Sequence, residues 1–467
     1  MKKYLILLGL VFAIIGCEDE LDRTPNDALI SETAFETVDD LEDGVNGIYT
    51  NFNPNFLVGF NTTFTDNGKL GLNNGGQSLN LLNQVLNTQT NSGQIWSSRY
   101  ATANDCNRII AAAEGVDVNP NEQELFNNLL AQAYGMRAYA HYDALLYYGE
   151  DLTDPTALGV PYQDEVRTEG NLARLTTEDT KNRIIEDLNT ANSLLASGFD
   201  DRFSVTKDFV SFLKARVSLI TEDWGAVISN TDDFINDYPL ADQQQYQDMF
   251  AGDADATEVI FAYDNVSGFN RNLAGQFRFT ASTTDNSYIE MSNELFNELT
   301  SAADVRFAVN VDQESAFGDG EIAINKYPAI GGLFINDYKI FRVSEAYLMR
   351  AEAFAHQDQF QNAADEVQAV KNARAGTQDN ATAYDNLVDA ITNIKRERRL
   401  ELCFEGHRYI DSKRYRNIVN EGIVRADEDC EGGIPCEIAV SSRKFTFPLP
   451  QAEINGNVDI KQNPQWE

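Results

Sequence analysis

The chain carries few of the side chains with which enzymes most often perform acid–base or nucleophilic chemistry. It has three histidines, His141, His356 and His407, and none belongs to an HExxH zinc motif. No nucleophile elbow, phosphate-binding loop or dinucleotide fingerprint occurs. Asp253 and Asp255 begin like a calcium loop, but the glycine and terminal glutamate of such a loop are misplaced. We therefore expect no enzymatic activity, no cofactor and no metal site.

Cys17 is the residue whose position implies chemistry most directly. Two lysines precede an apolar run from Leu5 to Ile15, which is the layout of a secretory signal. The run is too short to span a bilayer, because a spanning helix needs about 20 apolar residues. Gly16 follows the run and precedes Cys17, and a small residue before cysteine is typical of bacterial lipoprotein signals. We expect residues 1–16 to be removed and Cys17 to carry lipid; the alternative is an ordinary signal with an incidental cysteine.

A polar segment follows Cys17. Residues 17–30 are rich in acidic and turn-forming residues. Because a dozen residues of extended chain reach about 40 Å, we expect a flexible tether between the lipid and a single folded domain over residues 31–467.

The other cysteines are predicted to have structural roles. Cys430 and Cys436 flank a turn-rich segment, and an exported protein meets oxidising conditions, so they are candidates for a small-loop disulfide. Cys106 and Cys403 lie in helical patterns and are expected to be buried apolar residues. The absence of a CxxC pair argues against a zinc ribbon or a thioredoxin-type site.

Side chains able to bind a polar ligand gather in two stretches of weak periodicity, residues 54–92 and 251–342. Aromatic faces pack against the apolar faces of a ligand, and amide, carboxylate and guanidinium groups bond its hydroxyls. Long ordered loops are often functional. We nominate as ligand-binding residues Phe64, Asp66, Asn67, Asn73, Arg271, Arg278, Phe279, Tyr288 and Tyr327. For each aromatic the competing interpretation is a place in the core, because Phe and Tyr are usually buried.

Helical periodicity dominates the remainder of the chain. It predicts helices over 95–114, 122–148, 176–195, 209–221, 224–238, 343–357, 360–375 and 387–420, the last broken near Gly406. Thr37 to Asp40 matches a capping box at the start of an earlier helix. Residues 444–451 are predicted to form a short strand closed by prolines.

Weak internal repetition indicates how these helices pair. Ala138, Ala215 and Ala351 each precede an aromatic residue by nine positions. Small residues at close helix contacts and an aromatic at the start of the next helix are similar to tetratricopeptide pairs. The predicted fold is therefore mostly α, with tetratricopeptide-like helix pairs forming a scaffold, long irregular loops and a few short strands.

Composition sets broad limits. The chain has 467 residues, of which 43% are hydrophobic and 23% charged, as in globular proteins. Its formal net charge of −37 repels nucleic acid and anionic lipid. Neutral or cationic ligands remain compatible with that charge.

The C-terminal third resembles the SusD/RagB family. Residues 394–411 match its signature helix pair, and residues 447–455 followed by 462–466 match its terminal motif. Upstream segments at 95–110, 133–149 and 348–376 fit the family in the same order. The dense charges of residues 396–411 are interpreted as a structural ion-pair cluster that locks two helices, and not as ligand contacts.

The resemblance implies an outer-membrane lipoprotein that faces the cell exterior. Such proteins capture a nutrient, usually a glycan, and form a lid on a SusC-like TonB-dependent channel, which would be the partner. No nucleic acid partner is expected. Two alternatives stay open: a peptide-binding lipoprotein of the same type, and a tetratricopeptide scaffold that assembles envelope proteins. The sequence does not identify the ligand.

Overall fold

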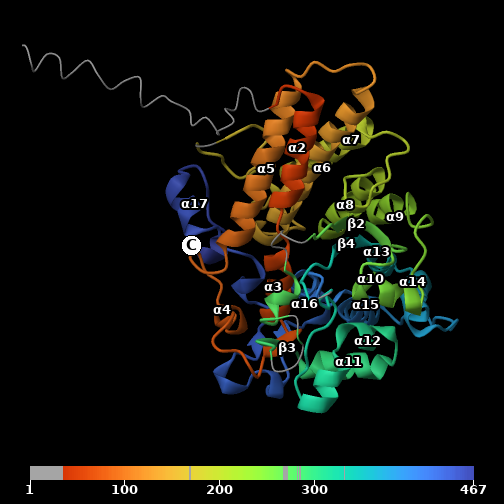
Figure 1. The fold of residues 1–467 in the computed structure, drawn as a ribbon. Coiled ribbons are helices and arrows are strands. Elements are labelled where there is room, and N and C mark those ends of the chain that lie inside the picture. The colour runs from red at the N-terminus through yellow and green to blue at the C-terminus, as the bar shows by residue number, and fades with distance from the viewer. Residues whose placement is uncertain (1–34, 168–169, 267–271, 281, 283–285, 331) are drawn as a thin grey trace, which may run out of the picture.

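The computed structural model describes residues 35–167, 170–266, 272–280, 282, 286–330 and 332–467 (Figure 1). The predicted signal peptide, Cys17, the tether and Arg271 lie outside these residues. Helices dominate the described part, and the predicted fold class, mostly α on tetratricopeptide-like helix pairs, is confirmed.

The N-terminal half contains helices of very different lengths that pack on one another. They are α2 (Val38–Asn51), α3 (Asn55–Thr63), α4 (Leu79–Leu82), α5 (Gly93–Ala113), α6 (Gln123–Tyr148), α7 (Thr177–Leu194), α8 (Lys207–Ile220) and α9 (Trp224–Asp232). Helices α2, α5, α6 and α7 lie side by side at the top of Figure 1. The capping box predicted for α2 is present, because Thr37 and Asp40 each accept a backbone hydrogen bond from the other.

The second half adds further helix pairs. They are α10 (Gln243–Ala251), α11 (Asn293–Ala302), α12 (Val305–Asn310), α13 (Val343–His356), α14 (Phe360–Ala375), α15 (Leu387–Leu402), α16 (Arg408–Val419) and α17 (Gln451–Gly456). Helix α8 pairs with α9, α13 pairs with α14, and α13 contacts both α8 and α9. The alanines that the repeat pattern selected, Ala138, Ala215 and Ala351, are completely buried. Small residues therefore stand where helices approach closely, as predicted.

Short antiparallel ladders form within the described residues, and two of them join distant parts of the chain. They pair β1 (Gly68–Leu70) with β3 (Ile289–Met291), β2 (Val259–Tyr263) with β4 (Tyr338–Arg342), and β5 (Ile423–Val424) with β6 (Glu437–Ile438). The register of β1 and β3 places Gly68 opposite Met291. The two irregular regions of the sequence are therefore adjacent in space.

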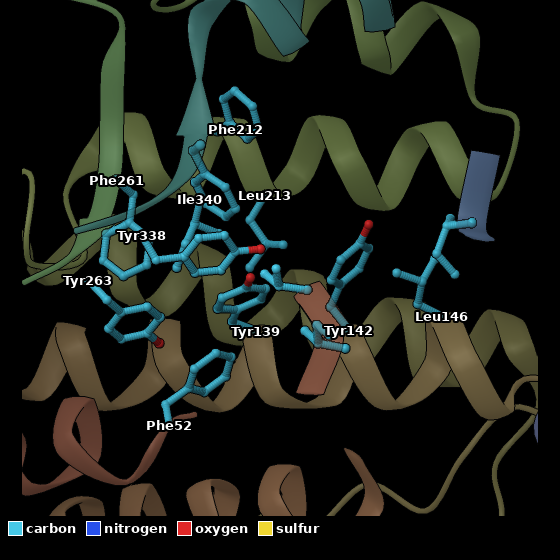
Figure 2. Packing of buried hydrophobic residues seen from close by; sticks show 14 of the residues in the cluster. Phe52, Tyr139, Tyr142, Leu146, Phe212, Leu213, Phe261, Tyr263, Tyr338 and Ile340 are labelled. Carbon is cyan, nitrogen blue, oxygen red and sulfur yellow. The ribbon is translucent and has the colours of Figure 1, made fainter. Parts of the chain in front are cut away.

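An aromatic core connects the helices to the β2–β4 ladder (Figure 2). The ring of Phe52 stacks between Tyr139 of α6 and Tyr263 of β2, with ring centroids 5.1 Å apart in both pairs. On the other side, Phe212 of α8 stacks on Phe341 of β4 at 4.5 Å. Offset aromatic pairs contribute about 0.5–1.5 kcal/mol each beyond their burial. These contacts hold the ladder against the helices.

The buried charge cluster of α15 and α16 is present, and its partners come mostly from other elements. Arg398 pairs with Asp411 at 2.9 Å and joins the two helices, as predicted. Glu401 instead meets Arg342 of β4 at 2.8 Å and Arg374 of α14 at 2.9 Å. The helical spacing of these charges indicated pairs within one helix, whereas burial places them against separate segments.

Three local predictions differ from the structure. Residues 54–92 contain the buried helix α3, because Phe60 and Phe64 stack on each other at 4.6 Å within the core. Helix α9 ends at Asp232 and not at residue 238. The strand predicted over 444–451 is wrong: Pro448 and Pro450 cannot donate to a ladder, and the Phe447 N–H bonds the Tyr147 carbonyl of α6 at 2.9 Å.

Candidate ligand-binding site

An open cavity of about 950 Å³ lies where α3, α4, α5 and residues 272–276 meet. Side-chain amides make up more than half of its lining. We call this cavity the amide groove; its lining residues are Asn53, Asn55, Phe56, Gly76, Ser78, Leu79, Asn80, Leu81, Asn91, Gln94, Ser98, Asn272 and Gln276. Its volume is near the upper end of the range of about 300–1,000 Å³ usual for ligand pockets.

The turn before α4 is held in place by one asparagine. The Asn74 amide donates to the carbonyls of Gln77 at 2.9 Å and Tyr288 at 2.7 Å, and its oxygen accepts the Gly76 N–H at 2.9 Å. Gly76 has a φ of +97°, which glycine adopts without steric cost. The backbone beside Ser78 is therefore fixed before any ligand binds.

The opposite wall is fixed by close packing of residues 274–276 on α3. A Cβ at Gly59 would lie 2.8 Å from Oε1 of Gln276, so glycine permits this approach. Within the wall, the Gly275 N–H donates to Oδ1 of Asn272 at 2.6 Å. The hydrogen bonds of this segment orient the amides of Asn272 and Gln276 at the groove.

Phe56 supplies the aromatic surface of the groove. It is half-buried, and its ring stacks on the buried Phe60 with centroids 5.6 Å apart. One face is thus supported by the core. A half-exposed ring among amides is suited to a sugar, whose ring has apolar sides and hydroxyl edges.

No acidic or basic residue occurs among the described residues that line the groove. The arginine beneath it is already paired: Arg99 is 2% exposed, its Nε donates to Asp143 at 2.7 Å, and its Nη1 donates to Ser98 Oγ at 3.1 Å. Its guanidinium also lies 3.6 Å from the ring centroid of Phe52. The groove therefore presents neutral hydrogen-bonding groups.

Three of the predicted binding residues meet on a surface beside the groove. Phe279 is 50% exposed and its ring lies 4.9 Å from that of the half-buried Tyr288. The N–H of the exposed Asn73 donates to the Ser287 carbonyl at 3.3 Å. The Tyr288 hydroxyl donates to the Gly275 carbonyl, next to the groove residue Gln276. We call Asn73, Phe279 and Tyr288 the aromatic ledge.

The other described candidates from the sequence are buried. The Asp66 carboxylate accepts hydrogen bonds from the guanidinium of Arg408, and only 3% of the residue is exposed to solvent. The positive charges of Arg399 and Arg408 hold the pKa of the Asp66 carboxyl well below its usual range. The remaining residues in this group, each at most 2% exposed, are Phe64, Asn67, Arg278 and Tyr327.

These buried residues support the loops from within. Arg399 donates to Asn67 Oδ1 at 3.0 Å, and Arg278 donates to the Tyr327 carbonyl at 3.4 Å. A ligand at the surface would not reach them in this structure. Both irregular regions of the sequence contribute residues to the groove, together with Asn53, Gln94 and Ser98 outside them. None of the nominated residues that the structure describes is part of its lining, and the sequence signal for its amides is the density of Asn and Gln between residues 51 and 94.

The cysteines and histidines lie apart from the groove. Cys430 and Cys436 form a disulfide with 5.2 Å between their Cα atoms, so their sulfurs are not free thiolate ligands for a metal. His141 accepts the Gln163 N–H at 2.9 Å, and His356 stacks on Trp224 with centroids 3.9 Å apart. His407 lies 3.9 Å from Glu345. None of the three histidines lines the groove.

Family models match both ends of the chain. The model described as "SusD family" matches residues 334–466, and the model described as "Starch-binding associating with outer membrane" matches residues 20–219. The SusD-like protein P2 of Formosa agariphila is 25% identical over 99% of this chain and 99% of its own length.

Solved structures share the fold. A SusD-like carbohydrate binding protein from Bacteroides vulgatus superposes with a TM-score of 0.75 at 19% identity, covering 91% of this chain and 98% of that one. A laminarin binding SusD-like protein gives a TM-score of 0.70 at 17% identity, covering 92% and 100%. Within the described residues, no helix has the length and apolar character needed to cross a bilayer.

Proposed function

Because this chain belongs to the SusD family, we propose that it is an outer-membrane lipoprotein that captures an extracellular glycan in the amide groove. The observation that carries the proposal is the groove's lining: amides, several of them held by hydrogen bonds, around the ring of Phe56, which packs on the core. Amides donate and accept at once, as the hydroxyls of a sugar require. The proposed role is binding, and the groove's described lining supports it with hydrogen-bonding amides and one aromatic ring.

In this proposal Cys17 carries the lipid, and residues 17–30 connect it to the folded domain. The domain then delivers its ligand to a TonB-dependent channel in the same membrane. Support comes from the family description, which names starch binding and association with the outer membrane. The names of the carbohydrate-binding and laminarin-binding relatives point to the same ligand class.

Phe56→Ala tests the site. Removing a stacking ring should cost about 1 kcal/mol, or about fivefold in affinity. Affinity of the purified full-length protein for laminarin and soluble starch would be measured by affinity electrophoresis and calorimetry. Phe317→Ala is the matched control, because Phe317 is 69% exposed and lies outside the groove lining.

The proposal predicts weaker binding for Phe56→Ala and unchanged binding for Phe317→Ala. Saturable binding of peptides, with no binding to any polysaccharide, would replace the glycan with a peptide ligand. Co-purification with envelope assembly factors in place of a channel would favour the scaffold alternative.

A further inference from the structure

We infer that the amide groove selects uncharged glycans and discriminates against carboxylated or sulfated ones. This inference rests on the proposed function and specifies its ligand class. Three observations support it: the neutral lining of the groove, the pairing of Arg99 beneath it, and the net negative charge of the chain.

The groove differs in composition from the chain around it. Charged residues make up 23% of the sequence, so several would be expected among thirteen lining positions chosen at random. The described lining has none. A second cavity, of about 200 Å³, shows the contrast: its lining includes Glu222, Glu352, Lys413 and Arg414. A third cavity, of about 870 Å³ beside α10 and α14, has one charged residue, Asp242, among its lining residues. The described lining of the groove therefore lacks the charges that the other two cavities carry.

The guanidinium of Arg99, which bonds the lining residue Ser98, is not available to a ligand. Arg99 pairs with Asp143 at 2.7 Å and is covered by Ser98 and Phe52. An anionic sugar that placed its carboxylate or sulfate against the groove wall would find no cation among the described lining residues. Burying a charge without a partner is costly, and like charges add to the cost.

The net charge of −37 acts in the same direction. A negative field lowers the local concentration of anionic polymers and leaves neutral ones unaffected. Amide groups, by contrast, bond hydroxyls equally well at any ionic strength, because neutral hydrogen bonds are not screened as ion pairs are. Affinity for a neutral glycan should therefore be insensitive to salt.

The test compares each glycan with a charged copy of itself. Laminarin and soluble starch, and the same polymers carboxylated at C6, would be titrated against the purified full-length protein at low and at 0.15 M salt. Whichever neutral polymer binds, we expect its affinity to be about tenfold or more higher than that of its carboxylated copy. Its dissociation constant should not change with salt.

A charge introduced into the groove should change this preference. Gln94→Lys places a cation at an exposed lining position in the first turn of α5. It should raise affinity for the carboxylated copy about twofold to fivefold, the range of an exposed ion pair, and salt should remove the gain. Gln123→Lys, in the first turn of α6 and outside the lining, is the matched control and should change nothing.

The possible failures are separable. If the carboxylated copy binds as tightly as the neutral polymer, and Phe56→Ala weakens both, the selectivity is refuted while glycan capture in the groove stands. If neither polymer binds, the proposed function fails together with the inference. Equal gains for Gln94→Lys and Gln123→Lys would also refute a selectivity set by the groove.

Discussion

Glu401→Gln tests whether the buried charge cluster stabilises the fold. Glu401 is completely buried in α15. Its Oε1 lies 2.8 Å from Arg342 Nη1 and 2.9 Å from Arg374 Nη2, and its Oε2 lies 3.6 Å from Arg306 Nη1. Glutamine keeps the shape of the side chain but removes the charge that these arginines share.

The expected loss can be bounded from the remaining contacts. Removing one partner of a buried ion pair usually costs about 3–5 kcal/mol, because the other charge stays buried. Here Glu258 still pairs with Arg342 at 2.9 Å and with Arg374 at 2.6 Å. Since both arginines keep a carboxylate, we expect the lower end, about 3 kcal/mol in the free energy of unfolding.

The measurement is urea unfolding followed by fluorescence and circular dichroism. Glu294→Gln is the matched control: Glu294 also pairs with a cluster arginine, Arg399, at 2.9 Å, but its side chain is 45% exposed. An exposed pair contributes at most about 1 kcal/mol. If the two variants lose the same small amount of stability, the buried cluster does not stabilise the fold in the way argued from its geometry.

Two further predictions concern pH and the anchor. Burial lowers the pKa of His141 and of His407 to about 4, so between pH 6.5 and 4 the unfolded chain binds protons that the folded chain does not. The stability that the neutral histidines contribute is thus present above pH 6.5 and is lost as pH falls, by about 2 kcal/mol per histidine at pH 5. His407→Gln should reduce this loss, measured by urea unfolding between pH 7 and pH 5. A loss equal to that of the unchanged protein would contradict this account. Cys17→Ala should leave glycan binding by the purified protein intact and abolish uptake by cells; normal growth on the glycan would show that the lipid is not required.

The sequence predicted the helices well because their signals are local. The spacing of apolar residues gave α6 almost to its observed bounds, and Thr37 with Asp40 gave the start of α2. These patterns depend on residues within one or two turns of a helix. Gly406 likewise marked the break between α15 and α16, where its φ is +89°.

The groove could not be assembled from the sequence in the same way. Asn80 and Gln276 line one cavity although almost two hundred positions separate them. The nearest local clue, an aromatic residue in an irregular segment, selected Phe64, which the structure buries, and did not select Phe56. Phe56 and Phe64 lie on the same helix or its cap, and only packing against other elements leaves one of them half-exposed.

By itself, the sequence determined the mostly helical class, the pairing of helices around small residues, the family resemblance and the expectation of a lipidated cysteine, because each is written in residues close together. Tertiary structure decided which polar residues face solvent and which are buried in the interior with charged or hydrogen-bonding partners. Asp66 and Asn80 both come from one irregular segment, yet Asp66 pairs with Arg408 in the interior while Asn80 lines the groove. The physical reason is that a side chain's role depends on the partners that folding brings to it from distant segments.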